Sequence, residues 1–167
     1  MLRLLYSIPC EKSIIDETGT TSLITILERA EVFVPPQAPE KFLLPRTWTV
    51  VTLWTRDDNP VPSPVDYEQR IEVVDVDNLV IFKADTLFTV SEQFRNFRNT
   101  SEFPAYPVFR DGIVLVNLFL RLKAGNEEWE KYHTFPIAFV RTTIEAPNES
   151  QADTEHENNA PEGIARV

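Results

Sequence analysis

Histidine, the side chain used most often in general acid–base catalysis, is nearly absent from this sequence. Only His133 and His156 occur among the 167 residues, and the second lies in the C-terminal segment. A catalytic triad or a histidine-based metal site would therefore depend on one residue. The alternation of residues 129–135 places His133 on a strand, where an exposed histidine is an ordinary surface residue. We predict no catalytic residues and no enzyme.

The single cysteine, Cys10, excludes an internal disulfide framework and a cysteine-rich metal cluster. It follows Pro9 and has no identifiable activating partner, so the sequence favours an inert buried thiol. Histidine and cysteine ligands are too few for a closed zinc site. We predict no cofactor and no bound transition metal, and a reducing cytoplasm as the compartment.

Acidic pairs occur at Asp57 and Asp58 and again at Asp75 and Asp77. A β-sandwich that gathers carboxylates from neighbouring loops can hold calcium through oxygen ligands, although tight turns require the same residues. Calcium or carbohydrate binding is therefore one alternative function. The enzymatic alternative is a pocket that combines paired carboxylates, tyrosine and His133.

Residues 94–110 concentrate aromatic and arginine side chains, beginning with a doubled Phe-Arg-Asn triplet at 94–99. Interface hot spots are rich in these residues, because they combine large contact area with stacking and forked hydrogen bonds. The structural alternative is that the phenylalanines fill the core while the arginines offset nearby acids. We predict that this stretch is the main partner-facing surface. The candidate binding residues are Phe94, Arg95, Phe97, Arg98, Tyr106 and Arg110.

Period-two alternation, typical of half-buried strands, supplies the elements that would position these residues. In residues 47–55, one face collects Trp48, Val50 and Trp54. In residues 67–73, Tyr67 begins an apolar face that alternates with charged residues, which suits a sheet with one wet face. The best core strand is 114–122, and the residues on its apolar face are Val114, Val116, Leu118, Leu120 and Leu122.

Turn signals separate these runs. The segments 16–20, 75–78 and 124–127 contain the Asp, Asn and Gly residues that tolerate left-handed backbone, so each predicts a hairpin turn. The 13 prolines cluster between apolar runs and mark loops at 35–45, 60–64 and 104–107.

Seven or eight strands without βα alternation predict an all-β protein, an antiparallel β-sandwich. The same pattern could instead close as a barrel, and residues 23–30 and 90–97 could be helical by propensity. We predict one domain over residues 1–144 and an acidic, flexible tail over residues 145–167, where six carboxylates face one arginine.

The net charge of −10 disfavours nucleic-acid binding through bulk electrostatics. No apolar run is long enough for a signal peptide or a membrane-spanning helix, so we expect no membrane association. The remaining partners are another protein or further copies of the same chain.

The order of residues 10–35 resembles the opening of a small bacterial all-β family of unknown function. It runs from Cys10 through Thr18 and Gly19 to Val34 and Pro35. The resemblance continues with a Trp-containing strand, an Asp-rich hairpin, and Asp111-Gly112 leading into an aliphatic strand, so that it spans roughly residues 5–141. It implies a bacterial source and the sandwich fold, and it brings no catalytic residues. The residues themselves favour a non-catalytic interaction module that acts by protein–protein binding or self-association.

Overall fold

The computed structural model describes residues 2–57, 64–91, 93, 95–109, 112–124 and 128–144. Eleven β-strands occur in this part of the chain. The strands are β1 (Leu2–Ile15), β2 (Thr21–Ile26), β3 (Arg29–Val34), β4 (Lys41–Leu44), β5 (Trp48–Arg56), β6 (Val65–Val74), β7 (Val80–Val90), β8 (Asn96–Phe103), β9 (Tyr106–Phe109), β10 (Gly112–Leu122) and β11 (Glu130–Thr143).

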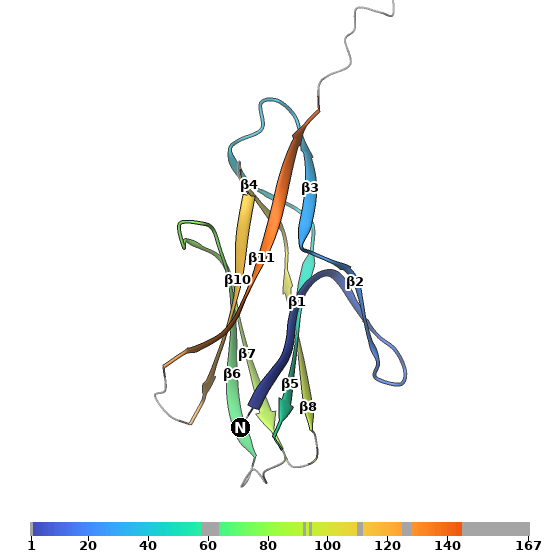
Figure 1. Ribbon diagram of the computed structural model, residues 1–167, viewed down its shortest axis with the longest axis vertical. Helices are drawn as coiled ribbons and strands as arrows, with labels where there is room; N and C mark the ends of the chain where they lie inside the picture. Colours follow the sequence, from blue (N-terminus) through green and yellow to red (C-terminus); the bar gives the residue numbers. More distant parts are fainter. Residues whose placement is uncertain are drawn as a thin grey trace, which may run out of the picture.

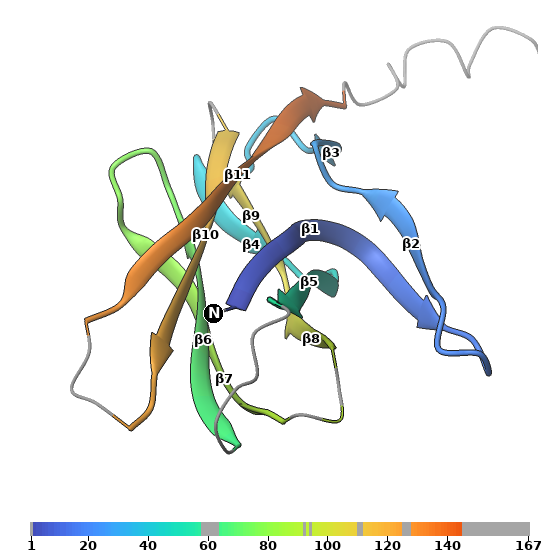
Figure 2. The ribbon, with the colours of Figure 1, turned by 60° about the horizontal axis from the view of Figure 1, so that its bottom comes forward.

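Two sheets form the layers of a sandwich, as Figures 1 and 2 show. The first sheet has the order β2-β1-β5-β8, the second has the order β3-β11-β10-β6-β7, and β4 pairs with β9 in a small third sheet. The predicted all-β sandwich, which is also the fold that the family resemblance implies, is confirmed.

Two details of the predicted fold differ from the structure. The strand count of seven or eight was too low, because β4 and β9 lie in proline-bounded segments that read as loops. Pro107 is tolerated in β9 because this strand belongs to a two-stranded ribbon. One pair, β3 with β11, is parallel, whereas every other pair is antiparallel.

The core lies between the two large sheets. Trp48, Val50 and Trp54 from β5 are fully buried, and the Trp48 ring stacks on Phe103 with ring centroids 4.7 Å apart. The predicted inward face of β10 is confirmed for Val114, Val116, Leu118 and Leu120, which are all buried. Leu122 is only half-buried, because it lies at the end of the strand.

Strand β6 has one face in the core and one face outside it, as its alternation predicts. Inside, the buried Gln69 accepts hydrogen bonds at Oε1 from Trp54 Nε1 and Thr52 Oγ1, both at 2.8 Å, which satisfies two donors that water cannot reach. On the outer face, Arg70 Nε donates to Asp85 Oδ1 at 2.7 Å.

Two hairpin turns share one construction. In the first turn, Asp16 N donates to Thr20 O and Gly19 N donates to Asp16 O, both at 3.0 Å. In the second turn, Asp75 N donates to Leu79 O at 3.1 Å and Asn78 N donates to Asp75 O at 3.0 Å. Each turn has its fourth residue at positive φ, with Gly19 at 80° and Asn78 at 60°. Both predicted turns are confirmed, and these are the residue types that this conformation favours. Most of the third predicted turn, residues 125–127, lies outside the described residues.

The described residues of the segments with helical propensity form strands and their connections, and none of them is helical. Residues 23–26 belong to β2 and residues 29–30 to β3, while residues 96–97 begin β8. Pairing with neighbouring strands therefore overrides their local propensity. In the described part of the chain no helix could span a membrane.

Strand β1 is long and strongly curved. Residues 2–10 pair with β5, and residues 10–15 pair with β2. In Figure 2, β1 arches away from the second sheet and carries β2 with it. We call residues 12–26, from the end of β1 through β2, the arm. The predicted acidic tail, residues 145–167, lies outside the described residues.

Candidate binding surface

The structure distributes the predicted binding residues over different environments. Phe94 and Arg110 lie outside the described residues. Arg95 is exposed just before β8, and its carbonyl oxygen accepts a hydrogen bond from Arg56 N at 2.9 Å. Phe97 is half-buried and packs against the core, with its ring centroid 6.3 Å from that of Phe88. Phe97 therefore fills the core, as the structural alternative expected for the phenylalanines.

Arg98 and Tyr106 have internal roles. Arg98 Nη2 donates to the carbonyl oxygen of Gly19 at 2.9 Å, so this arginine fastens the tip of the arm. Tyr106 is only 2% exposed, and its ring packs against Trp48 and Phe139. The prediction that Tyr106 faces a partner is therefore corrected, because its ring is part of the core.

A cluster of exposed apolar side chains lies away from the predicted binding residues, where β4 and β9 face the turn between β6 and β7. Two adjoining cavities of about 180 and 290 Å³ share Lys41, Asp75 and Phe109 in their walls. Five large aliphatic side chains on these walls are between 45% and 65% exposed, and they are Leu43, Val76, Leu79, Val80 and Ile113. We call this surface the β4–β7 groove.

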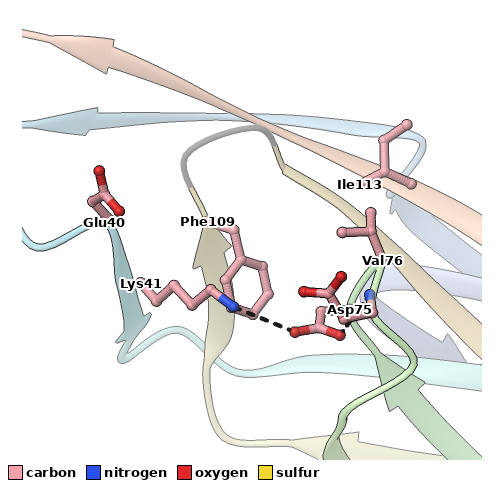
Figure 3. A pocket seen from close by; sticks show the side chains of 7 residues that line it. Glu40, Lys41, Asp75, Val76, Phe109 and Ile113 are labelled. Atoms are coloured by element: carbon pink, nitrogen blue, oxygen red, sulfur yellow. Dashed lines mark hydrogen bonds and ion pairs between the residues drawn. The ribbon is translucent and has the colours of Figure 1, made fainter.

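Asp75 lies in the groove because the turn after β6 holds it there (Figure 3). Its Oδ1 accepts hydrogen bonds from the backbone N–H groups of Asp77 at 3.0 Å and Leu79 at 2.9 Å. Its Oδ2 lies 3.6 Å from Lys41 Nζ. The side chain of Asp75 is 5% exposed and that of Lys41 is 62% exposed, so the pair joins a buried acid to a solvated base. The turn, rather than the lysine, therefore sets the position of this carboxylate.

Lys41 also crosses the aromatic wall of the groove. Its Nζ lies 5.4 Å from the centroid of the Phe109 ring, a cation–π distance. In Figure 3 the lysine extends from β4 past this ring towards Asp75. Glu40 and Asp77 also line the cavity, so carboxylates outnumber cations there. The groove thus combines an apolar floor with a net acidic rim.

The shape of the groove suits a flat or extended ligand. Each cavity is at or below the lower end of the range for small-molecule pockets, about 300 to 1,000 Å³. Contiguous exposed aliphatic side chains with a polar rim are typical of protein interaction sites. The arrangement can bind apolar side chains and position one basic group.

Catalytic features do not converge on the groove. Cys10 is buried with Sγ 3.2 Å from Thr49 Oγ1, and its burial raises the pKa of the thiol, so the predicted buried position is confirmed. His133 is exposed on β11. Within the described residues, no three histidine, cysteine or acidic side chains gather as a metal site. One carboxylate oxygen of Asp75 accepts hydrogen bonds from its own turn. This is the structural role that tight turns give to aspartate, which was the alternative to calcium binding.

A separate cavity of about 300 Å³, away from the β4–β7 groove, lies between Leu2 and the end of the β10–β11 hairpin. It brings tyrosine and glutamate side chains together. Tyr132 Oη donates to Glu130 Oε2 at 3.0 Å. Burial, with this glutamate beside it, raises the pKa of Tyr132 to about 12. The phenol therefore stays protonated at neutral pH and is not poised as a general base.

Sequence reasoning did not find the groove. Val76 was passed over as part of the predicted turn 75–78, although an apolar residue in a short turn is itself a signal of an unusual environment. Leu79 follows that turn and was assigned to the next strand. Leu43 lay in a proline-rich segment that read as a loop. The approach of Lys41 to Asp75 is a long-range contact, which no local pattern encodes.

No protein-family model matches the chain, and no curated protein is similar to it. Among solved structures, the chain is similar to Bacteroides uniformis beta-glucuronidase, at 15% identity and a TM-score of 0.45, over 64% of this chain. It is similar to a calcium-binding mutant of Bacteroides uniformis beta-glucuronidase 2 at 15% identity and a TM-score of 0.44, again over 64% of this chain. In both cases it spans 12% of the other chain. The chain is a β-sandwich module, and this likeness carries no argument about its activity.

Proposed function

We propose that this protein is a non-catalytic interaction module whose β4–β7 groove binds an extended segment of another protein. The observation that carries the proposal is the cluster of five aliphatic side chains, each at least 45% exposed, around the pair of Lys41 and Asp75. Monomeric soluble proteins rarely leave such patches open unless a ligand or partner covers them.

Burial of these side chains supplies the driving force. Covering apolar surface contributes about 25 cal/mol per Å². Leu79 and Val76 stand on the turn, while Leu43 and Phe109 stand on the opposite β4–β9 ribbon. A segment lying between them would contact both walls, and alternate side chains of an extended chain suit such a two-sided site.

The acidic rim selects the charge of the segment. Glu40, Asp75 and Asp77 outnumber Lys41 along the groove. Complementary charge speeds encounter and fixes register more than it adds affinity. The partner segment is therefore apolar with at least one lysine or arginine beside its apolar residues. The free, buried thiol of Cys10 is compatible with action in the cytoplasm.

The proposal is tested by selecting random peptides displayed on phage against the immobilised full chain. We expect enriched peptides that pair large apolar residues with a basic residue. Leu79→Asp and Leu43→Asp should each reduce binding of a selected synthetic peptide by about tenfold or more, since each places a charge in the apolar contact.

The matched control is Ile15→Asp, which introduces the same change on an exposed isoleucine of the arm. Melting temperatures of all three variants report whether the fold is intact. Peptide binding that survives both groove substitutions, or a selection that enriches no apolar and basic peptides, would contradict the proposal.

A further inference from the structure

The arm presents an open strand edge. β2 is the last strand of the first sheet, and among the strands that the structure describes it pairs with β1 alone. In Figure 2 the arch of β1 carries β2 away from the second sheet, so that β2 lies on the outer side of β1. The hydrogen bond from Arg98 to the carbonyl oxygen of Gly19 fastens the tip, which fixes the edge in place before any partner arrives.

The residue types of β2 lack the usual protection against edge pairing. Thr21–Ile26 contains no charged residue, no proline and no glycine, and its backbone is extended up to Thr25, where φ is 52°. The other edges of the two main sheets carry charges: Arg98 and Glu102 on β8, Arg29 and Glu31 on β3, and Lys83 and Asp85 on β7. In the third sheet, Lys41 and Pro107 serve the same purpose. Charges and prolines on edges prevent unwanted pairing, so β2 is the strand left able to pair.

The side chains of the arm are apolar on both of its strands. Four isoleucines are between 41% and 56% exposed, and they are Ile14, Ile15, Ile24 and Ile26. Lys12 is the one charged residue in the stretch where residues 12–15 pair with β2. In a chain with a net charge of −10, the two paired strands of the arm carry no carboxylate, and Asp16 and Glu17 lie in the turn at its tip.

We infer that two copies of this chain associate through β2, pairing the two edges antiparallel about a two-fold axis. An uncharged edge is complementary to itself in this arrangement, because each copy offers the same donors, acceptors and apolar side chains. The two arms then form one continuous four-stranded sheet, in which the side chains of the two β2 strands become cross-strand neighbours.

The expected dimer is weak and depends on concentration. The extended part of the edge, residues 21–24, is about 13 Å long, so the contact falls in the small class of interfaces, below about 1,200 Å². This inference concerns a different surface from the β4–β7 groove and does not rest on the groove's function.

Sedimentation equilibrium of the full chain over a range of concentrations tests the inference. We expect a reversible monomer–dimer equilibrium for the native chain. Ile24→Lys combined with Ile26→Lys should raise the dissociation constant of the dimer by about tenfold or more, because lysine on an edge opposes pairing. Leu79→Lys, a matched substitution in the groove, should leave the equilibrium unchanged.

Ser22→Lys is a milder variant on the exposed edge. It tests the role of β2 in dimerisation if circular dichroism shows that the double variant is unfolded. Weaker dimerisation of folded Ser22→Lys supports the inference. A native chain that is monomeric throughout, or a dimer that the folded β2 variants leave unchanged, would overturn it. A dimer that only Leu79→Lys dissolves would assign self-association to the groove and equally overturn the role of β2.

Discussion

The two turns that begin with aspartate, at Asp16 and at Asp75, have the same backbone hydrogen bonds, but the first aspartate is exposed and the second is buried. In the turn at Asp16, the carboxylate is exposed at the tip of the arm and accepts hydrogen bonds from Thr18 and Thr20. In the turn at Asp75, the carboxylate is buried beside Lys41 and the apolar walls of the β4–β7 groove. The same local sequence signal therefore builds a simple connection in one place and one wall of the β4–β7 groove in the other. Location in the fold, and not the turn itself, gives Asp75 its role.

The largest expected difference between the turns comes from removing the aspartates. Asp75→Ala leaves the backbone N–H groups of Asp77 and Leu79, whose hydrogen bonds are partly buried, without their acceptor, at a cost of about 1 to 3 kcal/mol of unfolding free energy. Asp16→Ala should cost less, because water replaces the carboxylate at its exposed turn. Urea denaturation of the two variants measures this difference.

Asp75→Asn sharpens the same comparison. The amide oxygen can still accept both backbone hydrogen bonds, so most of the stability lost in Asp75→Ala should return even though the charge opposite Lys41 is gone. If Asp75→Asn is as unstable as Asp75→Ala, the ion pair and not the turn holds this region together.

A smaller effect is expected at the left-handed positions. Gly19→Ala should cost about 1 kcal/mol, because φ is 80° there and an L side chain is strained in this region. An added Cβ would contact nothing within 4 Å, so the cost would come from the backbone alone. Asn78→Gly should change stability little, since glycine adopts the same conformation. Thermal unfolding monitored by circular dichroism tests both, and a neutral Gly19→Ala would show that the turn relaxes.

The turns, the long apolar strand and the sandwich could be predicted because their signals are local. Asp at the first position and Gly19 or Asn78 at the fourth specify the turns, and alternation along β10 specifies its buried face. The groove could not be predicted, because it depends on how β4 and β9 meet the β6–β7 turn in space. Tyr106 could not be placed from the sequence for the same reason. Tyrosine is common at interfaces, and only the long-range packing of this ring against Trp48 shows that it belongs to the core.

Acid should act on the exposed turn in a defined direction. The hydrogen bond from the Thr18 hydroxyl, together with the N–H of Thr20, lowers the pKa of Asp16 below 3.8. This stabilising contribution is present above pH 3.8 and is lost as the pH falls through the lowered pKa of the folded state. The stability advantage of the native chain over Asp16→Asn should therefore shrink below that pH. A difference that stays constant down to pH 2 would show that the charge is not involved.

The smallest effect on stability is expected for Lys41→Ala. Its ammonium is largely solvated, and pairs with an exposed partner contribute about 0 to 1 kcal/mol. Chemical denaturation should give nearly native values. A loss well above this range would mean that Lys41, and not the turn, fixes Asp75.

The most direct test of the binding surface is nuclear magnetic resonance mapping of a selected apolar and basic peptide on the full chain. We expect amide chemical-shift changes to concentrate at Leu43, Val76, Leu79, Phe109 and Ile113, with little change at the arm turn around Asp16. Shift changes centred on the arm, or spread over the β6–β10 face with the groove unaffected, would contradict the account.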